Sequence, residues 1–282
     1  MRLLIVVVGL CVAFACAGAE ALPTKSLVLD LDAAKGVHLE EGQQVGKWVN
    51  QAPGSSAKDF VKQDKGRKQA GSGRPTLRKA VPTLGGKDAL VFRQQELVCM
   101  DEDAFDGLST GKGHTWVTVL AVHKQRVGLK DVNSFFGNLR NGARYEGIWA
   151  NLDDANKVWW GGRNGKTFGR FDANNPKLTG PKLEENRFYV IAGRMGAGTG
   201  KVLCELFVDD PAKTVSTAQF PVDPKANPSK MAIGQERDAI EHPGKESFDG
   251  EIARLLIWER PLSDAELASV FTALSNHYSL TK

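Results

Sequence analysis

The stretch FDGEIARLLIWERPLSDAELASVFTALSNHYSL, residues 248–280, decides the fold. Its first part, residues 249–260, alternates apolar and polar side chains and carries Trp258, which is the pattern of a β-strand with a buried face. A Pro-Leu-Ser turn follows. The remainder has a helical pattern, so we predict a strand followed directly by a helix.

The predicted helix, Asp264–His277, has both a start signal and an apolar face. Ser263 and Glu266 form a capping box, in which the Ser263 hydroxyl binds a free amide of the first turn and Glu266 reaches back. The apolar residues that share one face at helical spacing are Leu267, Val270, Phe271 and Leu274. A short amphipathic helix needs a surface to pack on, so we expect it to lie against a sheet.

The rest of the chain repeats the strand pattern. Period-two runs bounded by turn residues occur at 26–32, 89–93, 96–100, 115–124, 134–139, 145–152, 157–163, 187–195, 201–210 and 230–236. Because almost no helix separates these runs, a parallel sheet with crossover helices is excluded. The sequence predicts an all-β fold, an antiparallel sandwich or jelly roll.

Length and composition favour a single domain. With 282 residues, of which 41% are hydrophobic, the chain can bury a sizeable core. The Gly- and Pro-rich stretches 65–86 and 221–227 are interpreted as surface loops, because similar strands continue on both sides. We therefore expect one domain over residues 22–282.

Residues 1–21, MRLLIVVVGLCVAFACAGAEA, have the pattern of a secretory signal peptide. Arg2 precedes an apolar run, and Ala19 and Ala21 supply the small residues for cleavage after Ala21, with cleavage two residues earlier as the alternative. No later run reaches the roughly 18 apolar residues of a membrane span. We expect an exported protein that is extracellular, periplasmic or on the cell surface.

Removal of the signal peptide leaves two cysteines, Cys99 and Cys204, each inside a predicted strand. A disulfide between them would close a long loop and stabilise the fold by about 4–5 kcal/mol. Two small buried thiols that never meet fit the same positions. Both interpretations stay open from the sequence.

The charge distribution excludes nucleic acid as the partner. The net charge is only +4, and the basic residues of stretch 62–79 are diluted by Gly, Ser and Gln in a predicted solvated loop. Nucleic-acid binders instead concentrate basic residues in a stripe with aromatic side chains among them.

Three stretches together carry a family resemblance: VGKWVNQA at 45–52, GGKDALVFRQQELVCM at 85–100, and the closing stretch 248–280. They resemble the laminin G-like jelly rolls of exported bacterial proteins, within the concanavalin A-like lectin/glucanase superfamily. The similarity runs from about residue 27 to residue 280. It implies an antiparallel two-sheet jelly-roll sandwich with a short C-terminal amphipathic helix, a fold used for binding glycans or proteins and sometimes holding calcium, but it does not fix the ligand.

No catalytic pattern is visible. The laminarinase-type glycosidases of this superfamily carry carboxylates at alternate positions of one strand, where a retaining mechanism needs two of them about 5–5.5 Å apart. The nearest stretch, DEDAFDG at 101–107, reads as a loop and lacks the completing Glu. In GRMGAGTGK, residues 193–201, Met195 and Val202 occupy the positions where a phosphate loop needs Gly and Ser or Thr. We expect a protein that is not an enzyme.

Two acidic loops are the candidates for a calcium site, and we expect no other cofactor. Hard cations bind several carboxylate and carbonyl oxygens, which Asp101 and Asp103 in one loop and Asp153 and Asp154 in another could supply. The alternative is that each loop is a solvated turn, because Asp favours tight turn geometry.

The segment YEGIWANLDDANKVWWGGRNG, residues 145–165, reads as a hairpin with neighbouring tryptophans Trp159 and Trp160 on opposite faces. Apolar Ile148, Ala150 and Leu152 mark the core side. An odd loop, residues 153–157, places Trp160 on that side and Trp159 outside; an even loop exchanges them.

The outer face of this hairpin is the candidate glycan-binding site. With the odd loop, Trp149 and Trp159 stack on sugar rings, while Asn151 and Arg163 bind sugar hydroxyls. The alternative is that a long neighbouring loop covers this face and makes it a satellite cluster. We hypothesise a secreted, non-catalytic carbohydrate-binding module. The rival is a structural or adhesive module that contacts a cell-surface or extracellular protein, and a polysaccharide-degrading enzyme of the same superfamily is the third alternative.

Overall fold

The structure is a computed structural model that describes residues 22–62, 73–125, 132–141, 144–167, 171–236 and 246–280. The predicted signal peptide, residues 1–21, lies outside these ranges. Within them, no helix is both long enough and apolar enough to cross a membrane.

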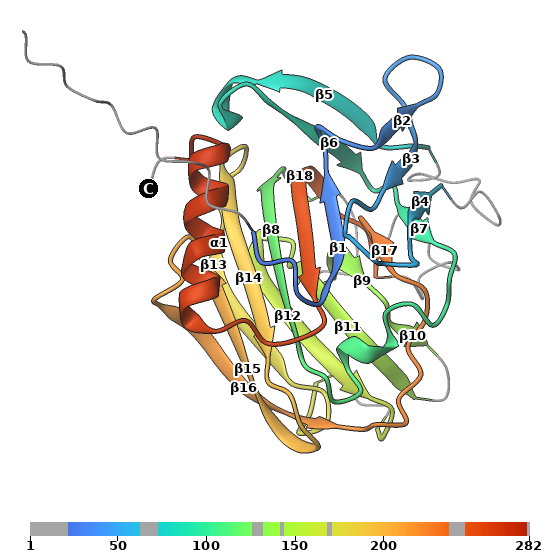
Figure 1. Cartoon of the computed structure of the whole chain (residues 1–282), viewed down its shortest axis with the longest axis vertical. Helices are drawn as coiled ribbons and strands as arrows, with labels where there is room; N and C mark the ends of the chain where they lie inside the picture. Colours follow the sequence, from blue (N-terminus) through green and yellow to red (C-terminus); the bar gives the residue numbers. More distant parts are fainter. Residues whose placement is uncertain are drawn as a thin grey trace, which may run out of the picture.

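Eight of the described strands form one antiparallel sheet (Figure 1). Its order is β16 (Thr214–Val222), β15 (Gly200–Val208), β14 (Phe188–Met195), β8 (His114–Val122), β18 (Asp249–Trp258), β6 (Lys87–Arg93) and β5 (Thr76–Val81), with β1 (Leu27–Asp32) also paired to β18. The predicted closing strand is therefore the central one, since β18 pairs with β8 along most of its length and with β6 and β1 along its other edge.

The other sheet has ten described strands. Its order is β13 (Lys177–Lys182), β12 (Lys157–Asn164), β11 (Tyr145–Leu152), β9 (Asn133–Gly137), β17 (Ala232–Ile233), β7 (Leu97–Cys99), β4 (Asp59–Val61), β3 (Val45–Val49) and β2 (Val37–Leu39), with β10 (Arg140–Asn141) paired to β11. Two short 3-10 turns, η1 (Pro82–Leu84) and η2 (Asp106–Leu108), join strands.

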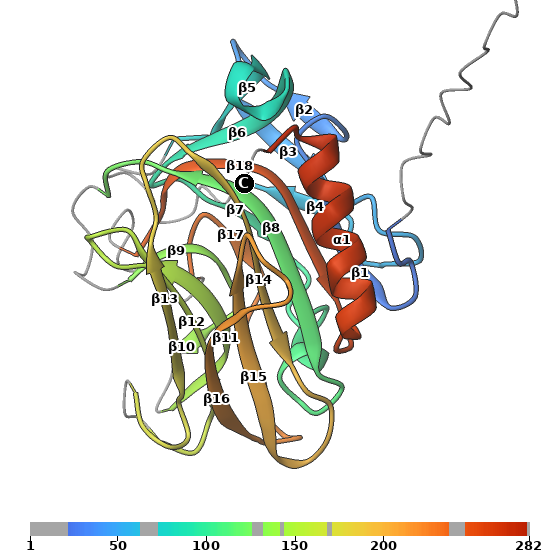
Figure 2. The same cartoon turned by 90° about the vertical axis from the view of Figure 1, so that its left-hand side faces the viewer.

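The helix and the two sheets form three layers, and the helix lies against a sheet, as the closing stretch predicted. Figure 2 shows α1 (Asp264–His277) on one side of the eight-stranded sheet and the ten-stranded sheet on the other. The capping box is present, because Glu266 N–H donates to Ser263 Oγ at 3.2 Å and Ser263 N–H donates to Glu266 Oε2 at 2.9 Å. The antiparallel two-sheet jelly-roll sandwich with its C-terminal helix is thus confirmed.

The sequence prediction missed β2, β3, β4 and β10 of the ten-stranded sheet and three polar edge strands. β5 lies inside the stretch 65–86 that was interpreted as a loop, which is wrong for residues 76–81. β13 and β16 were not predicted, because Gly, Pro and polar residues interrupt their apolar alternation. Each of these three edge strands has only one neighbour in its sheet, so side-chain burial constrains its sequence less.

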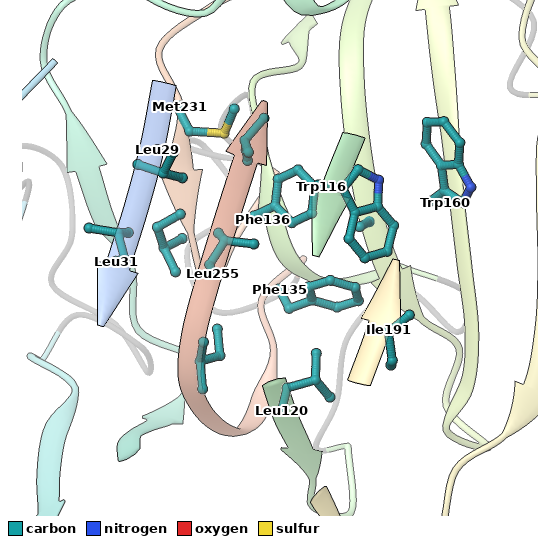
Figure 3. Packing of buried hydrophobic residues seen from close by; sticks show 14 of the residues in the cluster. Leu29, Leu31, Trp116, Leu120, Phe135, Phe136, Trp160, Ile191, Met231 and Leu255 are labelled. Carbon is teal, nitrogen blue, oxygen red and sulfur yellow. The ribbon is translucent and has the colours of Figure 1, made fainter. Parts of the chain in front are cut away.

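The main core lies between the two sheets (Figure 3). Trp116 from β8 meets Phe136 at 5.3 Å and Trp160 at 6.0 Å between ring centroids, and both pairs are edge-to-face. A second apolar layer lies between the eight-stranded sheet and α1, where Val117 and Val119 of β8 face Val270 of the helix. Both faces of β8 are covered, which explains why all nine of its residues are buried.

A buried histidine lies beside the aromatic rings of the main core. His114 is fully buried, its Nδ1 lies 2.7 Å from the Leu108 carbonyl oxygen, and its ring meets Trp160 edge-to-face. Burial lowers its pKa to about 4, because the charged imidazolium would lose its hydration.

This burial predicts an acid-sensitive fold. Between pH 6.5 and about 4 the unfolded chain binds a proton at residue 114 that the folded chain does not bind. The unfolding free energy should therefore decrease as the pH falls through this window, by up to about 3 kcal/mol from this residue. Urea unfolding of the wild type and of His114→Gln, at pH 7 and at pH 4, measures the difference. A wild-type advantage that does not depend on pH would contradict the prediction, as would an NMR titration in which His114 is already protonated at pH 5.5.

Candidate functional site

The hairpin β11–β12 adopts the odd-loop register. Ala150 pairs with Trp160 and Asn151 pairs with Trp159. Trp160 thus lies in the main core, while Trp159 joins Trp149 on the outer face of the ten-stranded sheet. The predicted assignment of the two tryptophans for an odd loop is confirmed.

The turn of this hairpin is held by Asp153. Its Oδ1 accepts hydrogen bonds from the backbone N–H groups of Ala155, at 2.9 Å, and Lys157, at 2.8 Å. Asn156 has a left-handed φ of 63°, which asparagine tolerates better than most residues. Local side-chain bonding by Asp153 therefore sets the register that separates the tryptophans.

Aromatic rings and cationic side chains gather on the outer face. The indoles of Trp149 and Trp159 meet edge-to-face with centroids 4.9 Å apart. The Arg163 guanidinium lies 4.8 Å from the Trp149 ring and 4.4 Å from the Tyr145 ring. Lys177 Nζ lies 4.4 Å from the Trp159 ring, a cation–π distance. We call these five residues together with Phe171 the aromatic cluster.

The aromatic cluster is closed, so the prediction of an open stacking face is wrong. Trp149 is 4% exposed, Trp159 1%, Arg163 2% and Asn151 0%. The physical reason is Phe171, which returns over the pair and meets Trp159 edge-to-face with a centroid distance of 5.4 Å. The alternative that was left open, a satellite cluster beneath a neighbouring segment, is the arrangement found. Phe171 itself is 36% exposed.

A polar row extends from the aromatic cluster across the same face. Asn151 pairs directly with Trp159 on one side and with Ser134 on the other, and Ser134 forms an isolated bridge with Ser247. The Ser134 hydroxyl donates to Asn151 Oδ1. Sequence alternation had identified Asn151, but Ser134 and Ser247 come from other strands and were missed.

Two buried polar atoms of this row are unsatisfied. Asn151 Nδ2 and Ser247 Oγ have no hydrogen-bond partner within the described chain, although their residues are 0% and 1% exposed. Leaving a buried donor unpaired costs about 1–3 kcal/mol, so such atoms need an explanation. A ligand with hydroxyl groups would supply partners for both atoms.

The four aspartates that were candidates for a calcium site do not form one metal-binding group in the described part of the chain. The described part of the chain contains no group of three or more His, Cys, Asp or Glu side chains placed to hold a metal ion. Asp153 holds its own turn, with Asp154 beside it, and Asp101 Oδ1 accepts from the Asp103 N–H at 3.4 Å. The turn interpretation is therefore the one these four residues fit.

The acidic segment 101–107 ends in the turn η2 and is not a strand, as expected. It contains one perturbed group that the sequence did not single out. Burial, reinforced by the charge of Asp103, raises the pKa of Asp106 to about 6.

Cys99 and Cys204 are unpaired and buried. The structure therefore agrees with the interpretation of two separate buried thiols and not with a disulfide. Cys99 lies in β7 of the ten-stranded sheet and Cys204 in β15 of the eight-stranded sheet. Burial raises the pKa of both thiols, which keeps them protonated and unreactive at neutral pH.

Sequence comparison matches residues 105–268 to the family Laminin_G_3, described as the concanavalin A-like lectin/glucanases superfamily. No curated protein matches the sequence.

Solved structures share the fold at low identity. A Trypanosoma rangeli sialidase in complex with sialic acid has 15% identity and a TM-score of 0.52, over 93% of this chain and 35% of the sialidase. The botulinum neurotoxin serotype D/C binding domain has 9% identity and a TM-score of 0.52, over 88% of this chain and 52% of that domain. The CBM40 of a Ruminococcus gnavus IT-sialidase, bound to alpha2,3 sialyllactose, has 17% identity and a TM-score of 0.48, over 63% of this chain and 92% of the module.

Because the aromatic cluster is closed, removing one of its buried rings should lower the free energy of unfolding. Trp159→Ala should lower the unfolding free energy by about 3–5 kcal/mol, the loss typical of a buried tryptophan. Phe171→Ala, which removes a partly exposed ring of the same cluster, should cost about 1 kcal/mol or less. Urea unfolding of both variants measures the difference. Equal small losses would mean that the Trp159 ring is a surface residue.

Proposed function

Because this chain belongs to the concanavalin A-like lectin/glucanases superfamily, we propose that it is an exported, single-domain, non-catalytic carbohydrate-binding protein. Its site is the outer face of the ten-stranded sheet, where the polar row Ser247, Ser134 and Asn151 meets the aromatic cluster. The signal-peptide pattern of residues 1–21 supports export.

The observation that carries the proposal is the unsatisfied amide of Asn151 beside the tryptophan pair. A sugar combines apolar C–H faces, which suit indole rings, with hydroxyl groups that accept and donate hydrogen bonds. Asn151 Nδ2 supplies a donor and Ser247 Oγ supplies a hydroxyl, both already removed from water. These two protein atoms are already desolvated before binding, so a new hydrogen bond to either one carries only the desolvation cost of the sugar hydroxyl.

Access to this site requires movement of Phe171. Its ring is the exposed edge of the aromatic cluster, so a glycan contacts it first. Its edge-to-face contact with Trp159, at 5.4 Å, is worth about 0.5–1.5 kcal/mol beyond area burial, and its ring also lies 6.4 Å from the Trp149 ring and 4.7 Å from Lys177 Nζ. A sugar face that stacks on Trp159 replaces this contact with one of similar kind.

The non-catalytic part of the proposal rests on the sequence pattern and the turn at 101–107. Segment 101–107 lacks the Glu that completes the carboxylate pattern of the glucanases, and it ends in a 3-10 turn. Release of reducing ends from β-glucans, galactans or alginates by the purified protein would contradict this part alone.

The binding part is tested on a glycan array, followed by calorimetry with the best ligand. We expect binding that Asn151→Ala weakens about tenfold, because it removes the buried amide donor that carries the proposal. The matched control is Asn276→Ala, on the exposed surface of α1. For the ring, Phe171→Ala should change affinity, while Leu203→Ala, an equally exposed apolar residue on β15, should not.

Two outcomes would contradict the proposal. If no glycan binds, the adhesive module that contacts a protein takes its place. If a glycan binds but Asn151→Ala and Phe171→Ala retain wild-type affinity, the site lies elsewhere on the molecule.

A further inference from the structure

A pocket lies at the end of the hairpin that carries the proposed site. It has a volume of about 330 Å³ and is lined by Asn156, Lys182, Leu183, Glu184 and Glu185. These residues come from the β11–β12 turn and from the end of β13 with the segment that follows it. The volume is at the lower end of the roughly 300–1,000 Å³ of small-molecule sites, so it suits a ligand of monosaccharide size.

The walls of this pocket are fixed by hydrogen bonds. The Leu183 N–H donates to the Asn156 carbonyl at 2.9 Å, and Gln125 Nε2 donates to Asn156 Oδ1 at 3.1 Å. On the opposite wall, the Glu184 N–H donates to Tyr189 Oη at 2.8 Å. The backbone therefore needs little ordering when a ligand binds, which lowers the entropic cost of binding.

The pocket carries charged side chains of both signs. Lys182 pairs in register with Lys157 of β12, so two ammonium groups sit on neighbouring strands. Glu184 and Glu185 follow Lys182 at the same wall. None of these four side chains forms an ion pair within the described chain. Like charges opposite one another in a sheet are destabilising, so the lysine pair is not there for sheet stability.

This set of groups matches a neutral sugar. Ammonium groups are hydrogen-bond donors only and carboxylates are acceptors only, whereas each sugar hydroxyl both donates and accepts. The lining itself carries one ammonium, Lys182, and two carboxylates, Glu184 and Glu185, so its charge does not favour an acidic ligand. Hydrogen bonds to charged groups are stronger than neutral ones, which suits a small polar ligand in an open site.

The pocket adjoins the end of the hairpin that carries the proposed glycan-binding face. Lys157 lies two residues from Trp159 on β12, so both side chains point to the outer face about 7 Å apart along the strand. Figure 2 shows β13 beside β12 at this edge of the sheet. A ligand that occupies the face of Trp159 and Asn151 reaches the pocket by extending along the hairpin.

We propose that this pocket is a second subsite, which binds a neutral terminal sugar of an extended oligosaccharide whose next units lie on the Trp159–Asn151 face. This inference rests on the proposed function and adds the ligand class: a neutral chain of several units, held at its end.

The test is calorimetry with a neutral oligosaccharide ligand in a series of increasing length, starting from the disaccharide. The pocket variant is Glu184→Gln combined with Glu185→Gln, and a second variant is Lys182→Met. Matched controls are Glu41→Gln and Lys213→Met, which alter exposed charges elsewhere. We expect both pocket variants to weaken binding of the longest oligosaccharide about tenfold, to leave disaccharide binding at the face unchanged, and to keep the wild-type melting temperature.

The outcomes separate the two proposals. If Asn151→Ala weakens binding while the pocket variants bind every length as the wild type does, the subsite is refuted and the glycan-binding face stands. If uronate or sulfated chains bind more tightly than the neutral chain, and the pocket variants lose this preference, the neutral ligand class is refuted. If the wild type binds no glycan, the proposed function and the subsite fail together.

Discussion

The pairing of β18 with its neighbours is the constraint on which the rest of the structure depends. β18 pairs with β8 on one edge and with β6 and β1 on the other. The last described strand is therefore joined directly to the first. The Asp30 carboxylate of β1 accepts two hydrogen bonds from the Arg254 guanidinium, both at 2.9 Å, which fixes this join laterally. With β8 and β18 at its centre, the sheet is covered on both faces, by α1 on one and by the ten-stranded sheet on the other.

Both faces of the eight-stranded sheet are covered. The outer face of the ten-stranded sheet is therefore the one whose side chains can vary without disturbing the main core. That face carries the side chains of β11 and β12 that alternation turns away from the core. Here the chain does not simply present polar residues to solvent. It buries Trp149, Trp159 and Arg163 beneath Phe171, and it leaves Asn151 Nδ2 buried without a partner. Departures of this kind from the rules of a stable fold are typical of functional surfaces.

An element that carried two independent sequence signals was predictable from the sequence. The helix had its capping box and its apolar face, and its bounds were predicted as they are found. The longer inner strands had alternation or continuous apolar runs, as in β8, whereas the short inner strands β3 and β4 were not predicted. β13 and β16 had neither, because an edge strand is selected for protection from further pairing as much as for burial. For the hairpin, alternation established that one tryptophan had to face outward, and the turn residue Asp153 then determined which one.

The sequence did not predict which segment covers the site or which residues from distant strands meet there. The covering of Trp159 depends on where the segment around Phe171 returns, and a long connection carries no local signal of its destination. Ser134 and Ser247 are far apart in the chain and become neighbours only through the sheet. The pocket beside Lys182 likewise arises where a turn meets a strand end, so its residues show no shared motif.

The join between β1 and β18 also has a kinetic consequence. Leu27 pairs with Trp258, so the eight-stranded sheet cannot close until nearly the whole chain has been synthesised. Pairings between residues so distant in sequence are formed late and slowly, because loop-closure entropy is lost before the contacts form. Until then β8 and β6 each keep one edge without its β18 partner, so the sheet is completed only once β18 is available.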